Sequence, residues 1–283
     1  NSGNEVVYGV QYHEAATREN KQVTGALVVV ANGAGSTLTR SVNQGKTIIA
    51  SCFVGLRLKN AAHLLPYVNH GNVFMVDPAP VLCYPVSSTD VRVLIDFPGS
   101  HAPNLTDDKC AQYLIEQICP SLPQSLHEPF IQTVRSGQVK CALNREMPAD
   151  LEMKKRGVIV LGDALNTRHP LTGGGMTVSF GDVLTLSQLL EGVSDLSDYD
   201  AVDQAMRILS QKRKRYASTI NILANALYAI FAPGDDDPMR SYMKKSVFSY
   251  FKLGGICATG PVSLLSGITQ SYHVLLTHFF SVA

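Results

Sequence analysis

The chain has 283 residues, 45% of them hydrophobic and 17% charged, so it is long enough for one large domain or two smaller ones with a real core. The charged fraction falls below the roughly 25% of an average soluble domain, which indicates that something other than water covers part of the apolar surface. The net charge of +1 gives no reason to expect nucleic acid or an acidic substrate as a partner.

Six cysteines occur without a C-x-x-C pair, and a chain of this length does not need disulfide bonds for stability. We therefore expect reduced, structural cysteines. The basic run at 212–215 precedes a helical pattern and is expected to form a solvated helix face. The sequence begins with Asn1 and shows no signal peptide, so we expect a fragment whose N-terminus lies upstream.

The first half of the chain favours β-structure. A polar turn near 17–20 predicts that the first two strands form a hairpin. After a glycine-containing turn at 32–35, Ser36 can cap a short helix. The predicted elements are strands over 5–12 and 22–30, a helix over 36–40, and strands over 47–56, 81–86 and 91–97, the last two as an antiparallel pair.

The second half favours helices around one apolar strand. Residues 158–161 are all apolar, which indicates a strand buried on both faces. Helices are expected over 107–118, over 126–134, and from the glycine cluster to about Leu190. A longer helix follows, interrupted by the acidic residues at 235–237. Its apolar positions recur at spacings of three, four and seven, which predicts a core-facing stripe: Met206, Leu209, Tyr216, Ile220, Leu223, Leu227 and Ile230.

Residues 253–283 contain no Asp, Glu, Lys or Arg. That length would permit a membrane span, but glycine and proline interrupt the segment repeatedly. A helical segment in the membrane interface, or the lining of an apolar cavity, fits the pattern better. An ordinary globular core is the alternative. The interrupting residues are Gly254, Gly255, Gly260, Pro261 and Gly267.

Several common motifs fail. Gly45-Lys46-Thr47 ends like a phosphate-binding loop, but Arg40 stands where the first glycine is required. Gly33-Ala34-Gly35 follows a strand, yet Leu38 replaces the third glycine of a dinucleotide motif. The sequence has neither a G-x-S-x-G elbow nor metal-ligand spacing among its histidines, so no metal site is predicted.

The informative segment runs from the strand at 158–161 to Met176. The strand delivers Asp163 to a sheet edge, where its carboxylate can accept hydrogen bonds from a ribityl or ribose hydroxyl. Pro170 stiffens the approach, and the glycines at 173–175 let backbone lie against a flat ring. The amides that open the next helix can stabilise a negative charge. A glycine-rich turn without a cofactor is the alternative interpretation.

These residues resemble the second flavin motif of the aromatic-hydroxylase-like flavoprotein monooxygenases, and most closely the squalene monooxygenase family. The resemblance covers nearly the whole chain, with residues 137–153 as a poor match. Two departures concern the family's N-terminal G-x-G-x-x-G loop, which is absent, and Asn32-Gly33, where the family has Asp-Gly. The residues that carry the resemblance are 162–164, 168–177, Pro78, 80–82, Tyr84, 92–94, Asp96, 250–255, Cys257, 260–262 and 278–280.

The resemblance implies an α/β (α+β) FAD-dependent monooxygenase fold in four segments. Residues 1–45 would form part of the FAD-binding domain, and 46–150 a substrate-binding domain with a mainly antiparallel sheet. Residues 151–195 would return to the FAD-binding domain with its Gly-Asp motif. Residues 196–283 would form a C-terminal helical, membrane-associated segment.

The resemblance also implies the site residues, with no catalytic side chain among them, because the flavin supplies the oxygen chemistry. The expected FAD-binding residues are Gly162, Asp163, Pro170, Gly174, Gly175 and Met176. The expected lining of an apolar substrate channel is Leu82, Tyr84, Leu171, Gly173, Phe231, Phe248, Phe251, Pro261, Leu264 and His278.

The implied reaction is epoxidation of squalene by O2 to (S)-2,3-oxidosqualene in sterol biosynthesis. Electrons would come from an NADPH-dependent cytochrome reductase, at the cytoplasmic face of the endoplasmic reticulum membrane, with no nucleic-acid partner. Two alternatives stay open. One is a flavoprotein hydroxylase of a different apolar substrate, and the other is a catalytically inactive membrane-bound paralogue. Without the N-terminal glycine loop, the chain alone is expected to bind FAD weakly or not at all.

Overall fold

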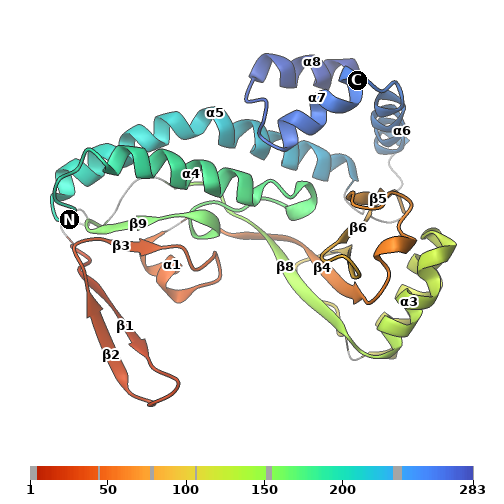
Figure 1. Ribbon diagram of the computed structural model, residues 1–283, viewed down its shortest axis with the longest axis horizontal. Coiled ribbons are helices and arrows are strands. Elements are labelled where there is room, and N and C mark those ends of the chain that lie inside the picture. Colours follow the sequence, from red (N-terminus) through yellow and green to blue (C-terminus); the bar gives the residue numbers. More distant parts are fainter. Residues whose placement is uncertain are drawn as a thin grey trace. The chain divides into compact units, whose positions relative to one another are not determined.

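The computed structural model describes residues 5–43, 45–76, 80–105, 107–150, 155–231 and 238–282. The chain forms two compact units, each with its own sheet and hydrophobic core (Figure 1). Unit 1 comprises Asn1–Ile48, Glu146–Leu227 and Ser246–Ala283. Unit 2 comprises Ile49–Arg145 and Tyr228–Lys245.

Unit 2 is built on a five-stranded sheet with the strand order β5-β6-β7-β4-β8. The predicted antiparallel pair is confirmed, because β6 and β7 pair with Val81 opposite Ile95. The short β5 and the polar β8 were not predicted. The strands are β4 (Ile48–Leu58), β5 (Asn72–Phe74), β6 (Val81–Pro85), β7 (Val91–Pro98) and β8 (Val139–Glu146).

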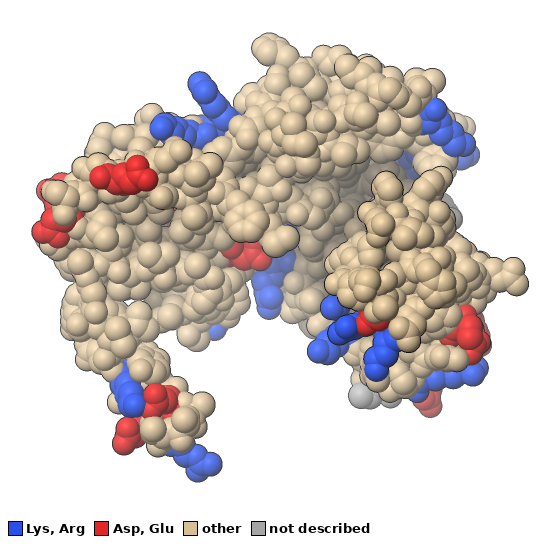
Figure 2. Space-filling model, in the orientation of Figure 1, with Lys and Arg blue, Asp and Glu red and all other residues tan. Residues whose placement is uncertain are grey.

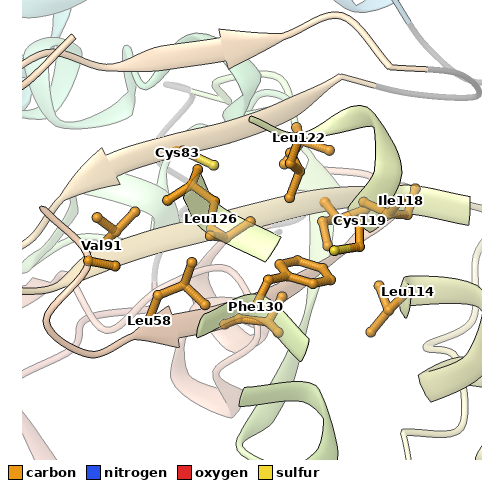
Figure 3. Packing of buried hydrophobic residues seen from close by; sticks show 14 of the residues in the cluster. Leu58, Cys83, Val91, Leu114, Ile118, Cys119, Leu122, Leu126 and Phe130 are labelled. Atoms are coloured by element: carbon orange, nitrogen blue, oxygen red, sulfur yellow. The ribbon is translucent and has the colours of Figure 1, made fainter. Parts of the chain in front are cut away.

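One face of this sheet packs against helices α2 (Asp108–Tyr113) and α3 (Gln124–Arg135). Side chains alternate along a strand, so every second residue of β4, β6 and β7 reaches this core. Figure 3 shows the ring of Phe130 among leucine and isoleucine side chains from both helical segments. The helix predicted over 107–118 is confirmed only as far as Tyr113. A π-helical turn (Leu114–Ile118) follows, which buries both of its end residues in the core.

The prediction that all cysteines are reduced is wrong for two of them. Cys52 on β4 and Cys141 on β8 form a disulfide, with their Cα atoms 6.6 Å apart. Neighbouring strands bring these residues together across 89 positions of sequence, which the spacing of cysteines could not reveal. Cys83 is free and buried, and burial raises the pKa of its thiol to about 12.

Unit 1 contains two small sheets. The predicted hairpin is confirmed as β1 (Gly9–His13) and β2 (Asn20–Thr24), which pair antiparallel. The strand predicted over 22–30 is divided at Gly25, and its second part, β3 (Val28–Val30), pairs in parallel with β9 (Val158–Val160). Segments about 130 positions apart in sequence thus share one sheet, as parallel pairing permits through a long connection.

Helices cover both faces of β3 and β9. Helices α4 (Gly175–Leu190) and α5 (Tyr199–Phe231) lie on one side and α1 (Thr37–Val42) on the other (Figure 1). The predicted cap of α1 is confirmed, because the Ser36 hydroxyl accepts a hydrogen bond from the Leu38 amide at 3.1 Å. The stripe of α5 is confirmed as core at four of its seven positions, which are buried: Met206, Leu209, Ile220 and Ile230.

Three helices, α6 (Pro238–Lys252), α7 (Ile256–Leu265) and α8 (Tyr272–Val282), end the chain. The expected interruptions are confirmed at Gly254, Gly255 and Gly267, which adopt positive φ between the helices, but the interruption expected at Gly260 and Pro261 is wrong, because both residues lie within α7. None of the helices within the described residues is long and apolar enough to cross a bilayer. The predicted acidic break at 235–237, and Pro78, lie outside the described residues.

Candidate functional site

The Gly-Asp segment forms a tight turn directly after β9. Gly162 adopts φ +62°, and its carbonyl accepts hydrogen bonds from the amides of Leu165 and Asn166, each at 3.0 Å. This short helical turn (Gly162–Ala164) buries Ala164 and leaves Asp163 exposed. The geometry therefore presents one carboxylate at the end of a buried strand, where ligands of α/β sheets commonly bind.

The glycine cluster forms the next turn, and its glycines meet different requirements. Gly173 needs the left-handed region, at φ +66°, after the short helix Pro170–Thr172. At position 174 the backbone packs so closely on α5 that only glycine fits, because a Cβ there would lie 2.4 Å from Cγ2 of Ile220. Helix α4 then begins at Gly175 without a side-chain acceptor for its first amides. Those amides are available to an anionic or carbonyl-bearing ligand.

A buried polar network lies behind the two turns, and Asn166 is its centre. Its side-chain oxygen accepts hydrogen bonds from Nη2 of Arg168 at 2.6 Å and Nη2 of Arg213 at 3.0 Å. The amide of Asn221 donates to the same oxygen at 3.2 Å. The side-chain nitrogen of Asn166 donates to the Met147 carbonyl at 2.7 Å. One buried amide thus connects the Gly-Asp turn to helix α5.

The second part of this network is an ion pair between α4 and α5. Nε of Arg213 donates to both carboxylate oxygens of Asp182, at 2.9 and 3.1 Å, and both side chains are buried. The Tyr216 hydroxyl donates to the same carboxylate at 2.7 Å. Burial, followed by this bond, raises the pKa of Tyr216. The prediction of a solvated basic run at 212–215 is wrong for Arg213, because the helix turns this residue toward α4 while its neighbours remain exposed.

Arg168 completes the network from beneath the glycine turn. Its guanidinium is buried and donates to the carbonyls of Asn166 at 3.1 Å and Gly174 at 3.4 Å. Burial, together with the positive charge of Arg213, lowers the pKa of Arg168 to about 10, so it remains charged at neutral pH. The sequence motif contained Arg168 and Asn166, but no role had been predicted for either.

Asn32 and Gly33 organise the turn that leads into α1. Gly33 adopts φ +87°, which favours glycine. The side-chain nitrogen of Asn32 donates to the Ser36 hydroxyl at 2.6 Å, and its oxygen accepts from Thr39 at 3.2 Å. Asparagine therefore keeps this turn through neutral hydrogen bonds.

The predicted substrate residues divide between the two units. Leu82 and Tyr84 lie on β6 and face away from the helix-packed core of unit 2. Phe231 also belongs to unit 2. The remaining seven belong to unit 1 and lie on the glycine turn and the three C-terminal helices. That all ten line one channel stays a prediction.

Within unit 1, the C-terminal helices pack closely on each other and on α4. The Tyr250 hydroxyl lies 2.7 Å from Nδ1 of His278. A Cβ on Gly260 would lie 2.1 Å from Nε2 of that ring, so α7 and α8 approach through a glycine. A Cβ on Gly267 would lie 2.6 Å from Cγ2 of Thr177, which sets the α7–α8 turn against the first turn of α4. The α7–α8 turn thus lies against the start of helix α4.

Comparison with known proteins identifies the family. Residues 24–283 match the family described as squalene epoxidase. The chain belongs to the squalene epoxidase family. It is 42% identical over 280 residues to squalene epoxidase 1 of Arabidopsis thaliana, covering 99% of this chain and 52% of that protein. It is 42% identical over 284 residues to the squalene monooxygenase of Mus musculus, covering 99% of this chain and 47% of that protein. The chain therefore spans about half the length of these curated relatives.

Solved structures show the same fold at low sequence identity. HpxO of Klebsiella pneumoniae, determined with FAD and uric acid, matches with a TM-score of 0.63 and 15% identity, over 99% of this chain and 64% of that one. PqsL of Pseudomonas aeruginosa, determined with 2-aminobenzoylacetate, matches with a TM-score of 0.55 and 18% identity, over 82% of this chain and 63% of that one. The mixed α/β fold with its antiparallel sheet is thus shared with FAD-binding proteins.

Proposed function

We propose that the protein carrying this chain is an FAD-dependent monooxygenase that epoxidises squalene with O2 to (S)-2,3-oxidosqualene in sterol biosynthesis. Membership of the squalene epoxidase family, matched over residues 24–283, is the observation that carries the proposal. Electrons would come from an NADPH-dependent cytochrome reductase.

The residues of unit 1 fit the ring end of FAD. Helix α4 opens without a side-chain acceptor, and Asp163 extends from the neighbouring turn. Among the described residues, the buried hydroxyl of Thr172 has no hydrogen-bond partner, which leaves it free for a ligand. We propose Gly162, Asp163, Pro170, Gly174, Gly175 and Met176 as the FAD-binding residues.

When bound, the flavin would supply the activation of oxygen, and the side chains would orient the cofactor and exclude water. A thirty-carbon hydrocarbon needs an apolar channel. We propose that Leu82, Tyr84, Leu171, Gly173, Phe231, Phe248, Phe251, Pro261, Leu264 and His278 line it. In this arrangement the alkene must come within about 3–3.5 Å of the reacting oxygen.

We also propose that the C-terminal helices contact the endoplasmic reticulum membrane from its cytoplasmic face. The visible surface of α7 and α8 carries no charged side chain (Figure 2). Large apolar side chains on this segment are exposed, including Leu253, Ile256, Ile268 and Phe280. Flotation of the full-length protein with liposomes tests the proposal. Ile268→Ser with Phe280→Ser is expected to reduce binding, and unchanged flotation would contradict it.

The enzymatic proposal is tested with purified full-length protein, squalene, a cytochrome reductase, NADPH and ¹⁸O₂. We expect 2,3-oxidosqualene that contains one ¹⁸O atom. Flavin-loaded protein that gives no such product, with reductase activity intact, would overturn the squalene assignment.

Asp163→Ala tests the cofactor site. Each lost charge-assisted hydrogen bond removes about 1.5–3 kcal/mol, so FAD is expected to bind at least tenfold more weakly. Flavin absorbance of the purified variants measures this, and Glu191→Ala, an exposed acid at the end of α4, is the control. Equal flavin content in both variants would refute the role of Asp163.

Phe251→Ala tests the channel. If Phe251 borders substrate, the variant raises KM or lowers turnover while flavin content and melting temperature stay normal. If the residue serves only packing, activity, flavin and stability fall together. Measuring all three on one preparation separates these outcomes.

A further inference from the structure

The buried side chains of this network include two guanidinium groups and one carboxylate, and the exposed carboxylate of Asp163 attracts Arg168 from the neighbouring turn. Arg168 and Arg213 both donate to the neutral oxygen of Asn166. The one buried carboxylate of the network, Asp182, is occupied by Arg213 and Tyr216. Among the described residues, no carboxylate lies within ion-pair distance of Arg168. A buried guanidinium without a carboxylate in direct contact is unfavourable unless nearby negative charge compensates it.

The position of Arg168 indicates where that negative group would lie. Its Nη1 donates to the Gly174 carbonyl, and a Cβ on Gly175 would lie 3.6 Å from the same nitrogen and 4.0 Å from Oδ1 of Asp163. The cation is therefore placed directly behind the N-terminus of the 16-residue helix α4. Helix N-termini carry partial positive charge, so the helix and the arginine together attract negative charge, of which the exposed carboxylate of Asp163 supplies part.

An unpaired donor on Arg168 is a second feature that is typical of a ligand-binding site. Nε of Arg168 is buried and, within the described part of the chain, has no hydrogen-bond partner. Buried donors in native proteins are almost always paired. The orphaned donor thus belongs to the same side chain that holds the Gly174 carbonyl, directly before the uncapped N-terminus of α4.

We propose that Arg168 is a positioning residue that holds the turn at 173–175 and selects for negative charge on the ring of the bound flavin. The inference rests on the proposed FAD site. FAD would then bind more tightly in the reduced, anionic state of its ring than in the oxidised, neutral state. Because binding and reduction are linked, that preference raises the reduction potential of the bound cofactor by about 30 mV for each tenfold difference in affinity.

The test compares the flavin midpoint potential and the affinity for oxidised FAD in four full-length proteins: wild type, Arg168→Met, Arg168→Lys and Arg215→Met. Arg168→Met removes the charge but keeps the length of the side chain. Arg168→Lys keeps the charge. Arg215→Met removes one positive charge from the exposed face of α5 and is the control.

We expect Arg168→Met to bind reduced FAD at least tenfold more weakly relative to oxidised FAD, with a potential at least about 30 mV below wild type. Arg168→Lys and Arg215→Met are expected to stay near the wild-type potential. An unchanged potential in Arg168→Met, or an equal fall in Arg215→Met, overturns the proposal.

Two further outcomes keep the test decisive. If Arg168→Met loses flavin and Arg168→Lys retains it at the normal potential, the requirement for charge is supported. If both lose flavin with an equal fall in melting temperature, Arg168 serves packing alone and the proposal fails. Wild-type protein that binds no FAD overturns the cofactor site and the Arg168 proposal together. Failure to epoxidise squalene, with normal FAD binding, overturns only the substrate assignment.

Discussion

The apolar core of unit 2 and the polar network of unit 1 are both buried, yet we expect them to tolerate substitution differently. In unit 2, Leu126 and Phe130 contact many neighbours through weak, non-directional forces, so a smaller side chain removes part of the stabilisation. In unit 1, the Asp182 carboxylate depends on two named donors. Removing the Arg213 donor leaves the buried negative charge of Asp182 without a compensating cation. The comparison predicts graded losses in unit 2 and abrupt ones in unit 1.

The largest effect is expected from Arg213→Met. The substitution leaves Asp182 buried without its cation, which should reduce the free energy of unfolding by about 3–5 kcal/mol. Urea denaturation measures the loss, and Lys212→Met, at the exposed neighbouring position, is the control. Adding Asp182→Asn to Arg213→Met should restore part of the stability, since the stranded charge is gone. A loss below about 1 kcal/mol would show that the pair is dispensable.

Leu126→Ala in unit 2 should cost about 2–5 kcal/mol, because a fully buried side chain leaves a cavity. Leu126→Met nearly conserves volume and should cost less than about 1.5 kcal/mol. The same denaturation experiment measures both. If the two variants lose equal stability, this core is as intolerant as the polar network and the comparison breaks down.

A smaller effect is expected at the polar corner of unit 2, where Asp90 accepts hydrogen bonds from the Asn60 amide at 3.2 Å and the Thr89 hydroxyl at 2.9 Å. These bonds, and then Arg57, lower the pKa of Asp90. A lowered pKa in the folded state means that the stabilisation is present above the unfolded value of about 3.9 and is lost as the pH falls through the folded value.

Melting temperatures between pH 6 and pH 2 test this expectation. Asp90→Asn should be less stable than wild type near neutral pH, and the difference should shrink at the acidic end. Glu128→Gln, at an exposed position on α3, should differ little from wild type throughout. A constant gap between wild type and Asp90→Asn would show that the carboxylate charge contributes nothing.

Sequence predicted best the elements that carry their own local signals. Ser36 stands directly before a helical pattern, and 158–161 is an uninterrupted apolar run. Strand β8 lacked such a signal. Its sequence is rich in polar residues, and Asn144 is buried with hydrogen bonds that the Ser51 hydroxyl and the Asp96 carboxylate accept, at 2.8 and 3.1 Å. Partners 93 and 48 positions away cannot be inferred from the strand itself.

The candidate site also has a part that local sequence signals predicted and a part that they did not. The turns at Gly162 and Gly173 follow from glycine positions that the motif already contains. The network behind them does not, because Asp182 and Arg213 pair between two helices that only the tertiary fold aligns. Arg213 even belongs to a basic run, which favoured exposure. The signal that could have found it is the apolar stripe of α5, since Arg213 lies seven residues before Ile220, on the same helix face.

The disulfide between Cys52 and Cys141 gives unit 2 a covalent cross-link in addition to its packed core. The first segment of this unit runs from Ile49 to Arg145, so the bond lies near both ends of that segment. It makes the intervening segment a covalent ring. A protease that cuts the ring once opens it without releasing a fragment, and the two pieces stay tethered until a reductant is added. Electrophoresis of nicked protein with and without reductant would show one band becoming two. A single cut between Cys52 and Cys141 therefore leaves the chain in one piece under oxidising conditions and separates it into two fragments under reducing ones.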